Sequence, residues 1–134
     1  MGVQRLTPEG LFKPAAYTQV VVATGRRLVF VSGQVSMDAD GKLVAPGDLA
    51  GQARQVYANL RAALGGAGAK PADVVKLTTY VVGYRPELRP QLAEARSTVF
   101  GPAALPASTL VGVQALAEPG YLIEVEAIAV IDQA

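Results

Sequence analysis

One amphipathic segment lies between two apolar runs rich in β-branched residues, and this order limits the folds open to the chain. Residues 49–64 place apolar side chains on one side at helical spacing, and Asp48 precedes them as a good N-cap. The flanking runs, 27–35 and 75–82, are expected to be strands. A helix that links two strands of one sheet is a crossover, so part of the sheet is expected to be parallel.

The remaining segments extend this sheet and add a second helix. That helix is expected to begin near Pro86 to Pro90 and to end near Phe100, and Asp40-Gly41 predicts a turn into a short return strand. Further strands are predicted at 18–23, 108–113 and 121–131. We therefore expect one α/β (α+β) domain over residues 1–134, a single mixed sheet with two helices on one face.

The last predicted strand indicates what lies on the other face of that sheet. One side of it is apolar, whereas the alternate side mixes apolar residues with two carboxylates, Glu124 and Glu126. Two helices cover only one face, so a half-apolar second face lacks a partner within the chain. A face of this kind is typical of a subunit interface that contains a polar cleft.

Composition removes several classes of chemistry. The chain has no cysteine and no histidine, which excludes disulfides, thiol nucleophiles, serine–histidine catalysis and the usual zinc ligands. A net charge of +1 without a basic run argues against a nucleic-acid partner. No apolar run is long enough for a membrane span or a secretory signal, so we expect a cytoplasmic protein.

A few polar residues remain as candidates for chemistry. Glu124 and Glu126 share one strand face and could transfer protons, although two solvated strand carboxylates would show the same spacing. Ser108 and Thr109 have no visible base partner, which argues against nucleophiles and leaves hydrogen-bond donors or ordinary strand-entry residues. Tyr17 reads from the sequence alone as a packed aromatic with a solvated hydroxyl.

Four stretches carry motifs whose combination is more specific than any one of them. They are PAAYTQ at 14–19, VFVSGQVS at 29–36, QARQVYANLRAALGGAGAKPADVVKLTTYV at 52–81 and LPASTLVGVQALAEPGYLIEVEAIAV at 105–130. In this order they resemble the Rid family, the reactive intermediate deaminases also called YjgF-like or endoribonuclease L-PSP proteins. The resemblance covers nearly the whole chain.

The resemblance implies a chorismate-mutase-like fold assembled as a homotrimer around a central barrel, with small-molecule ligands in clefts between subunits. Active family members hydrolyse imines and enamines to 2-keto acids and ammonia without a metal or an organic cofactor. By position, the cleft tyrosine corresponds to Tyr17 and the ligand-contacting Ser-Gly pair to Ser32 and Gly33. The glutamate that positions water or moves a proton corresponds to Glu124.

One family residue is missing. The deaminating branch has Pro-Ala-Arg where this chain has Pro106-Ala107-Ser108, and that arginine pairs with the substrate carboxylate. An asparagine that some branches carry in the second helix is also absent, with Ala93 nearest to its position. Ser108 therefore predicts a shorter, neutral and roomier pocket.

Three functions remain open from the sequence. The first is a trimer whose cleft, containing Tyr17, Ser32, Gly33, Ser108, Thr109 and Glu124, binds a small carbonyl or imine compound and hydrolyses a non-standard imine. The second is a non-catalytic trimer that binds a ligand or a partner. The third is an endoribonuclease or translation inhibitor, which the near-neutral charge and the lack of histidine disfavour.

Overall fold

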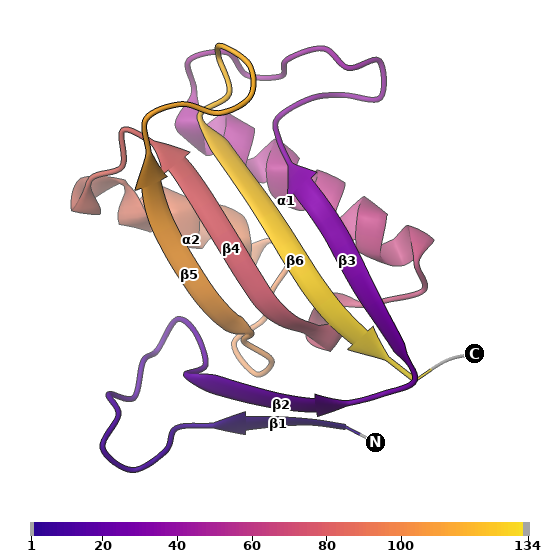
Figure 1. The fold of residues 1–134 in the computed structure, drawn as a ribbon. Coiled ribbons are helices and arrows are strands. Elements are labelled where there is room, and N and C mark those ends of the chain that lie inside the picture. Colours follow the sequence, from indigo (N-terminus) through magenta and orange to yellow (C-terminus); the bar gives the residue numbers. More distant parts are fainter. Residues whose placement is uncertain (1, 133–134) are drawn as a thin grey trace.

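The computed structural model describes residues 2–132, and its elements follow the predicted order with one added strand at the N-terminus (Figure 1). The helices are α1 (Leu49–Gly66) and α2 (Arg89–Ser97). The strands are β1 (Gly2–Leu6), β2 (Val20–Thr24), β3 (Arg27–Gln34), β4 (Val74–Val82), β5 (Ala107–Val113) and β6 (Ile123–Ile131). Short 3₁₀ turns, Pro71–Asp73 and Pro86–Leu88, precede β4 and α2.

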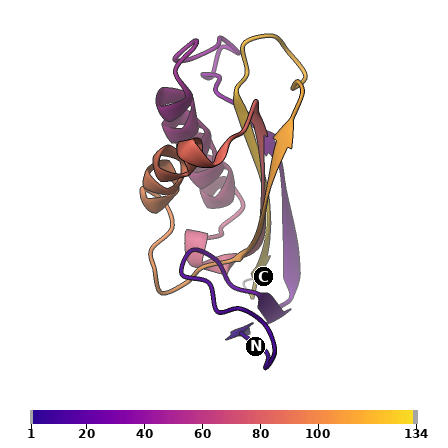
Figure 2. The same cartoon turned by 90° about the vertical axis from the view of Figure 1, so that its left-hand side faces the viewer.

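Four strands form the main sheet in the order β3-β6-β4-β5, and both helices cover one of its faces (Figure 2). Strand β6 pairs antiparallel with β3 and β4, whereas β4 and β5 are parallel. The predicted parallel pairing is confirmed, but it is α2 that connects the paired parallel strands. The α1 crossover links β3 to β4, which run in the same direction with β6 between them.

The N-terminal strands differ from the prediction of a single sheet. Strand β2 pairs antiparallel with β1 in a separate two-stranded sheet instead of joining β3. Gly25, between β2 and β3, lies so close to β6 that a Cβ there would overlap Val130. The return strand expected after Asp40-Gly41 is reduced to one bridge between Met37 and Leu43. The mixed class and the two helices on one face are confirmed.

The core lies between the helices and the main sheet. Side chains from α1, including Val56, Leu60 and Leu64, are fully buried against inward-facing sheet residues such as Leu77 and Val125. The Asp48 side chain accepts a hydrogen bond from the Gly51 backbone, so the predicted N-cap is confirmed. Within residues 2–132, neither helix combines the length and apolar character needed to cross a membrane.

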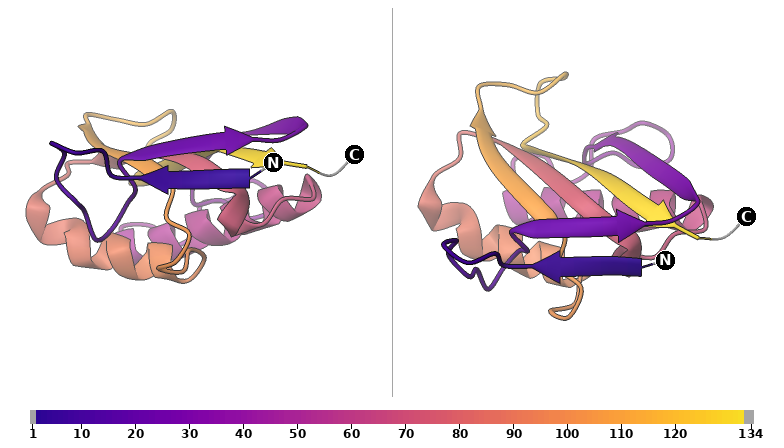
Figure 3. Two further views of the ribbon diagram at one scale, coloured as in Figure 1. Left: turned by 90° about the horizontal axis from the view of Figure 1, so that it is seen from below. Right: turned by 60° about the horizontal axis from the view of Figure 1, so that its bottom comes forward.

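The opposite face of the main sheet is uncovered. Phe30 and Leu28 on β3 are 71% and 64% exposed, and the outward residues of β6 are only half-buried. The β1–β2 pair and the loop that joins these strands lie at one end of the main sheet, with the loop on the side of β5 (Figure 3). The sheet therefore has one closed face, one open face and two edge strands, β3 and β5.

Candidate functional site

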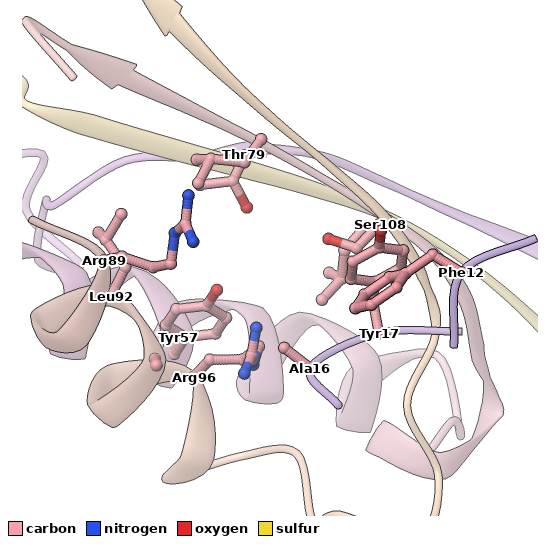
Figure 4. A pocket seen from close by; sticks show the side chains of 12 residues that line it. Phe12, Ala16, Tyr17, Tyr57, Thr79, Arg89, Leu92, Arg96 and Ser108 are labelled. Carbon is pink, nitrogen blue, oxygen red and sulfur yellow. The ribbon is translucent and has the colours of Figure 1, made fainter. Parts of the chain in front are cut away.

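A pocket of about 520 Å³ opens between the sheet, the two helices and the loop after β1 (Figure 4). Its volume is within the range of small-molecule sites in proteins. The lining residues are Phe12, Ala16, Tyr17, Tyr57, Leu77, Thr79, Arg89, Leu92, Ala93, Arg96, Ser108 and Leu110. The lining contains two arginines and no acidic residue, so the pocket favours an anionic ligand.

This charge corrects the expectation of a neutral pocket. Helix α2 presents Arg89, Leu92, Ala93 and Arg96 to the cavity, a spacing of i, i+3, i+4 and i+7 that defines one helix face. Arg96 is half-buried and Arg89 is exposed. The prediction considered only the chain near Ser108, whereas the fold brings the cations from another element.

Two hydroxyls lie with the arginines on this side of the pocket (Figure 4). Tyr57 is 3% exposed, and its burial raises the pKa of the phenol, while Arg96 and a side-chain hydrogen bond with Thr79 act in the opposite direction. A raised pKa keeps the phenol protonated at neutral pH. Tyr57 can therefore donate a hydrogen bond to a bound anion.

Ser108 and Thr109 do not form a pair, because successive strand residues point to opposite faces. Ser108 is in register with Leu77 and lines the pocket. Thr109 lies on the uncovered face, where its hydroxyl accepts a hydrogen bond of 2.7 Å from Lys76 Nζ. Only Ser108 belongs to the helix-side pocket.

Tyr17 reaches the pocket because its loop is fastened to the start of β5. The backbone N–H of Thr18 donates to the Pro106 carbonyl at 3.0 Å, and the Thr18 hydroxyl donates to the Leu105 carbonyl at 2.6 Å. In Figure 4, Tyr17 lies with Phe12 and Ser108 across the pocket from the arginines. Tyr17 therefore lines the helix-side pocket from the loop that precedes β2.

Glu124 lies on the uncovered face, away from the pocket, and is adjacent to Gly33. Strand β3 carries an irregularity between Val31 and Gln34 that brings Gly33 against β6. A Cβ at position 33 would overlap the Glu124 carboxylate, so glycine is the residue that leaves room for it. Ser32 is exposed beside this contact. Gly33 and Glu124 therefore form one unit of close contact on the open face.

Glu126 has a different environment on the same face. The Tyr80 hydroxyl donates to Glu126 Oε1 at 2.6 Å, and this hydrogen bond is the main cause of the raised pKa of Tyr80. Desolvation lowers the pKa of nearby Lys76, against the opposing effect of Glu126. The Glu126 carboxylate therefore already accepts a hydrogen bond from Tyr80 and interacts with the charge of Lys76. Within residues 2–132, no cluster of three or more acidic side chains is arranged to hold a metal ion.

The predicted residues thus fall into two groups on opposite faces. Tyr17 and Ser108 line the pocket, whereas Gly33, Glu124 and Thr109 face the open side of the sheet. Sequence reasoning missed the α2 arginines, together with Tyr57 and Thr79. The seven-residue spacing of Arg89 and Arg96 is a signal that could have placed both arginines on one helix face.

Known proteins of similar sequence and structure identify the family. The family model described as Endoribonuclease L-PSP matches residues 11–131. A RutC family protein of Pyrococcus abyssi is 37% identical over 101 residues, 75% of this chain and 76% of that protein. A 2-iminobutanoate/2-iminopropanoate deaminase of Rattus norvegicus is 36% identical over 115 residues, which are 86% of this chain and 80% of that protein.

The crystal structure of the Rid family protein YyfB of Yersinia pestis matches with a TM-score of 0.90 and 38% identity, over 98% of this chain and 100% of that one. The chain therefore belongs to the endoribonuclease L-PSP family of Rid and YjgF-like proteins.

Proposed function

We propose that the protein hydrolyses small imines or enamines in clefts between the subunits of a homotrimer. The proposal is carried by one observation, namely that the candidate site residues are divided between the two faces of the main sheet. The Gly33–Glu124 unit lies on the open face, and the pocket with Tyr17 and Ser108 lies on the helix side. Neither half alone combines a ligand cavity with a carboxylate. The rat relative, named as an imine deaminase, supports the type of reaction.

A second copy of the chain is the natural source of the missing half. Gly33 is on β3 and Ser108 on β5, the two opposite edges of the main sheet. An interface that joins different surfaces of two copies repeats from copy to copy and can close into a ring. Phe30 and Leu28 supply exposed apolar area for such a contact on the open face. A trimeric ring would bring each Glu124 to a neighbour's pocket.

The chemistry needs few groups. Water adds to the imine carbon, the carbon–nitrogen double bond becomes a single bond, and the nitrogen gains a proton. The resulting carbinolamine releases ammonia as its hydroxyl oxygen forms the carbonyl, so imine and water give ketone and ammonia. In this proposal the Glu124 carboxylate takes the proton from the attacking water and returns it to the leaving nitrogen. Tyr17 and Ser108 line the cavity that holds the substrate.

The test compares Glu124→Gln with the unchanged protein and with Glu118→Gln, which alters an exposed loop carboxylate. The assay follows 2-oxobutanoate released from 2-iminobutanoate, the substrate type in the rat relative's name. Loss of a general base is expected to lower the rate by about 100-fold or more, whereas Glu118→Gln leaves it unchanged. Equal rates for both variants would contradict the proposal. Ligand binding without hydrolysis would indicate a non-catalytic binding trimer instead.

A further inference from the structure

The two pocket arginines have a role that the Glu124 chemistry does not use. We propose that Arg96, assisted by Arg89, binds the carboxylate of the substrate from helix α2, and that the ligands are 2-imino and 2-oxo acids with an apolar side chain. This inference rests on the proposed function, because it specifies the substrate class of the same site. It also gives a reason why Ser108 is tolerated on β5.

The geometry of α2 directs both cations into the cavity. Arg89, Ala93 and Arg96 follow one another along the helix face that lines the pocket. Ala93 is small and leaves open space between the longer side chains. Leu92 and Ala95 are buried in the core and fix the orientation of the helix. The arginines are therefore held by a packed element, and only their side-chain ends need to adjust to a ligand.

The surroundings of Arg96 lack an acidic partner. Among the residues that the structure describes, one ion pair forms, between the exposed side chains of Arg85 and Glu87 at 3.8 Å, and it does not involve Arg96. A half-buried guanidinium loses part of its hydration, which an anion can replace. The Tyr57 phenol lies beside Arg96 and stays protonated, so it can share a carboxylate with it. These groups together form a cationic, hydrogen-bond-donating wall.

Arg89 occupies the first residue of α2, where helix polarity does not favour a cation. Its Nε donates a long hydrogen bond of 3.4 Å to the Tyr84 hydroxyl, and no acidic residue lies in the first turn. Helix stability therefore gives no reason for an arginine at this position. A second positive charge at the pocket does give one, because it strengthens the attraction for a carboxylate.

The opposite wall determines the rest of the ligand. Phe12 on that wall is apolar, Leu110 and Ala16 add apolar surface elsewhere in the lining, and Ser108 has a short side chain where the family's deaminating branch has arginine. If the carboxylate binds at α2, the ligand's side chain extends toward β5 and meets these groups. The cavity of about 520 Å³ leaves room for such a side chain. The resulting ligand is an acid with an apolar tail.

The test measures binding of 2-oxobutanoate and of its neutral analogue 2-oxobutanamide by calorimetry. Arg96→Gln and Arg89→Gln are compared with Arg54→Gln, a matched change at an exposed arginine of α1. The unchanged protein is expected to bind the acid about tenfold or more tightly than the amide. Arg96→Gln should remove this preference, Arg89→Gln should weaken acid binding by about a few-fold, and Arg54→Gln should change neither.

Three results would overturn the carboxylate assignment. They are equal affinities of the unchanged protein for acid and amide, no binding of the acid, and equal acid binding by Arg96→Gln and Arg54→Gln. Arg96 also lies in the last turn of α2, where a cation stabilises the helix, so the amide affinity of the same variant reports on structural damage. Hydrolysis that depends on Glu124, together with acid binding that does not depend on Arg96, would reject the carboxylate assignment and leave the proposed reaction standing. An arginine-dependent acid preference without hydrolysis would reject the proposed reaction alone.

Discussion

The contact between Gly33 and Glu124 leaves no room for one additional carbon atom. Gly33→Ala would place its Cβ on the Glu124 carboxylate, and the carboxylate is the part that can move, because it ends a flexible side chain. We expect Gly33→Ala to lower imine hydrolysis about tenfold or more by displacing Glu124. Unfolding free energy should change by no more than about 1 kcal/mol.

Gly101→Ala is the matched control for this substitution, because a Cβ at position 101 meets no atom within 4 Å. It should leave both hydrolysis and stability unchanged. The measurements are the steady-state rate and urea unfolding of each variant. Full activity in Gly33→Ala would show that the position of the Glu124 carboxylate does not limit the reaction.

The sequence pointed to some of the candidate site residues and missed others for physical reasons. Glu124 and Gly33 come from contiguous motifs, so a match along the chain was enough to nominate them as candidate site residues. Thr109 was grouped with Ser108 although strand alternation separates them, and its contact is Lys76. The arginines lie 12 and 19 residues before Ser108, and only the packing of α2 on the sheet brings them to the same pocket.

Among the elements, α1 is joined to the loops beside the sheet by one buried side chain. Gln52 is fully buried, its amide donates to the carbonyls of Gly120 at 2.9 Å and Ala45 at 3.3 Å, and its oxygen accepts from the Leu122 N–H. Gln52→Met would leave these backbone groups without partners. We expect a loss of about 2 kcal/mol or more in unfolding free energy.

The control for Gln52 is Gln55→Met, one turn further along α1. Gln55 donates within the same helix to Asn59, so its loss should cost less than about 1 kcal/mol. Thermal and urea unfolding of the two variants give the comparison. Similar losses in both would mean that the Gln52 hydrogen bonds contribute no more than a surface contact.

The buried phenol of Tyr57 makes the helix–sheet packing sensitive to alkaline pH. Burial raises its pKa above the ordinary 10.0, so above that pH the unfolded chain loses the proton first. The contribution of Tyr57 to stability is therefore complete below pH 10 and declines as pH rises through the raised value. Tyr57→Phe should lack this decline. Tyr80 and Lys76 titrate both in the unchanged protein and in Tyr57→Phe. The difference in unfolding free energy between these two proteins therefore isolates Tyr57.

Urea unfolding of the unchanged protein and Tyr57→Phe between pH 8 and about 11.5 checks this sign. The expected result is a constant difference in unfolding free energy up to about pH 10, followed by a relative loss for the unchanged protein. A difference that does not vary with pH over this range would show that the phenol titrates alike in the folded and unfolded chains.

The sequence predicted α1, its N-cap and β4 to β6 because local periodicity and capping agree with the final packing. It missed β1, a short and partly polar strand without clear alternation, and therefore assigned β2 to the wrong sheet. Strand pairing between distant segments depends on tertiary contacts that propensity does not encode.

For the whole molecule, the open sheet face predicts self-association. We expect sedimentation to give a trimer, and Phe30→Asp to release monomers by placing a charge on the most exposed apolar residue of that face. Ala62→Asp, on the exposed side of α1, should leave the trimer intact. An unchanged assembly state in Phe30→Asp would show that the contact between subunits lies on another surface.

Assembly is also the level at which sequence reasoning stops. The alternation of side chains in the last strand predicted a sheet face without a partner, and in the described residues that face of the main sheet is uncovered. The resemblance supplied the number of subunits, because no pattern in one chain specifies the symmetry of a ring. The relation of the two halves of the site to assembly depends on the faces and edges of the sheet on which they lie, and folding of the whole chain sets those positions.

In the trimer that we propose, Glu124 of one copy acts on a ligand in the pocket of another. Its most direct test mixes Glu124→Gln subunits with Ser108→Trp subunits, whose pocket is filled, and measures imine hydrolysis after denaturation and reassembly. Each variant alone should be inactive. Random mixing in equal amounts restores an intact carboxylate opposite an intact pocket in about a quarter of the sites, so about a quarter of the original activity is predicted. A mixture as inactive as its components would contradict a site shared between copies.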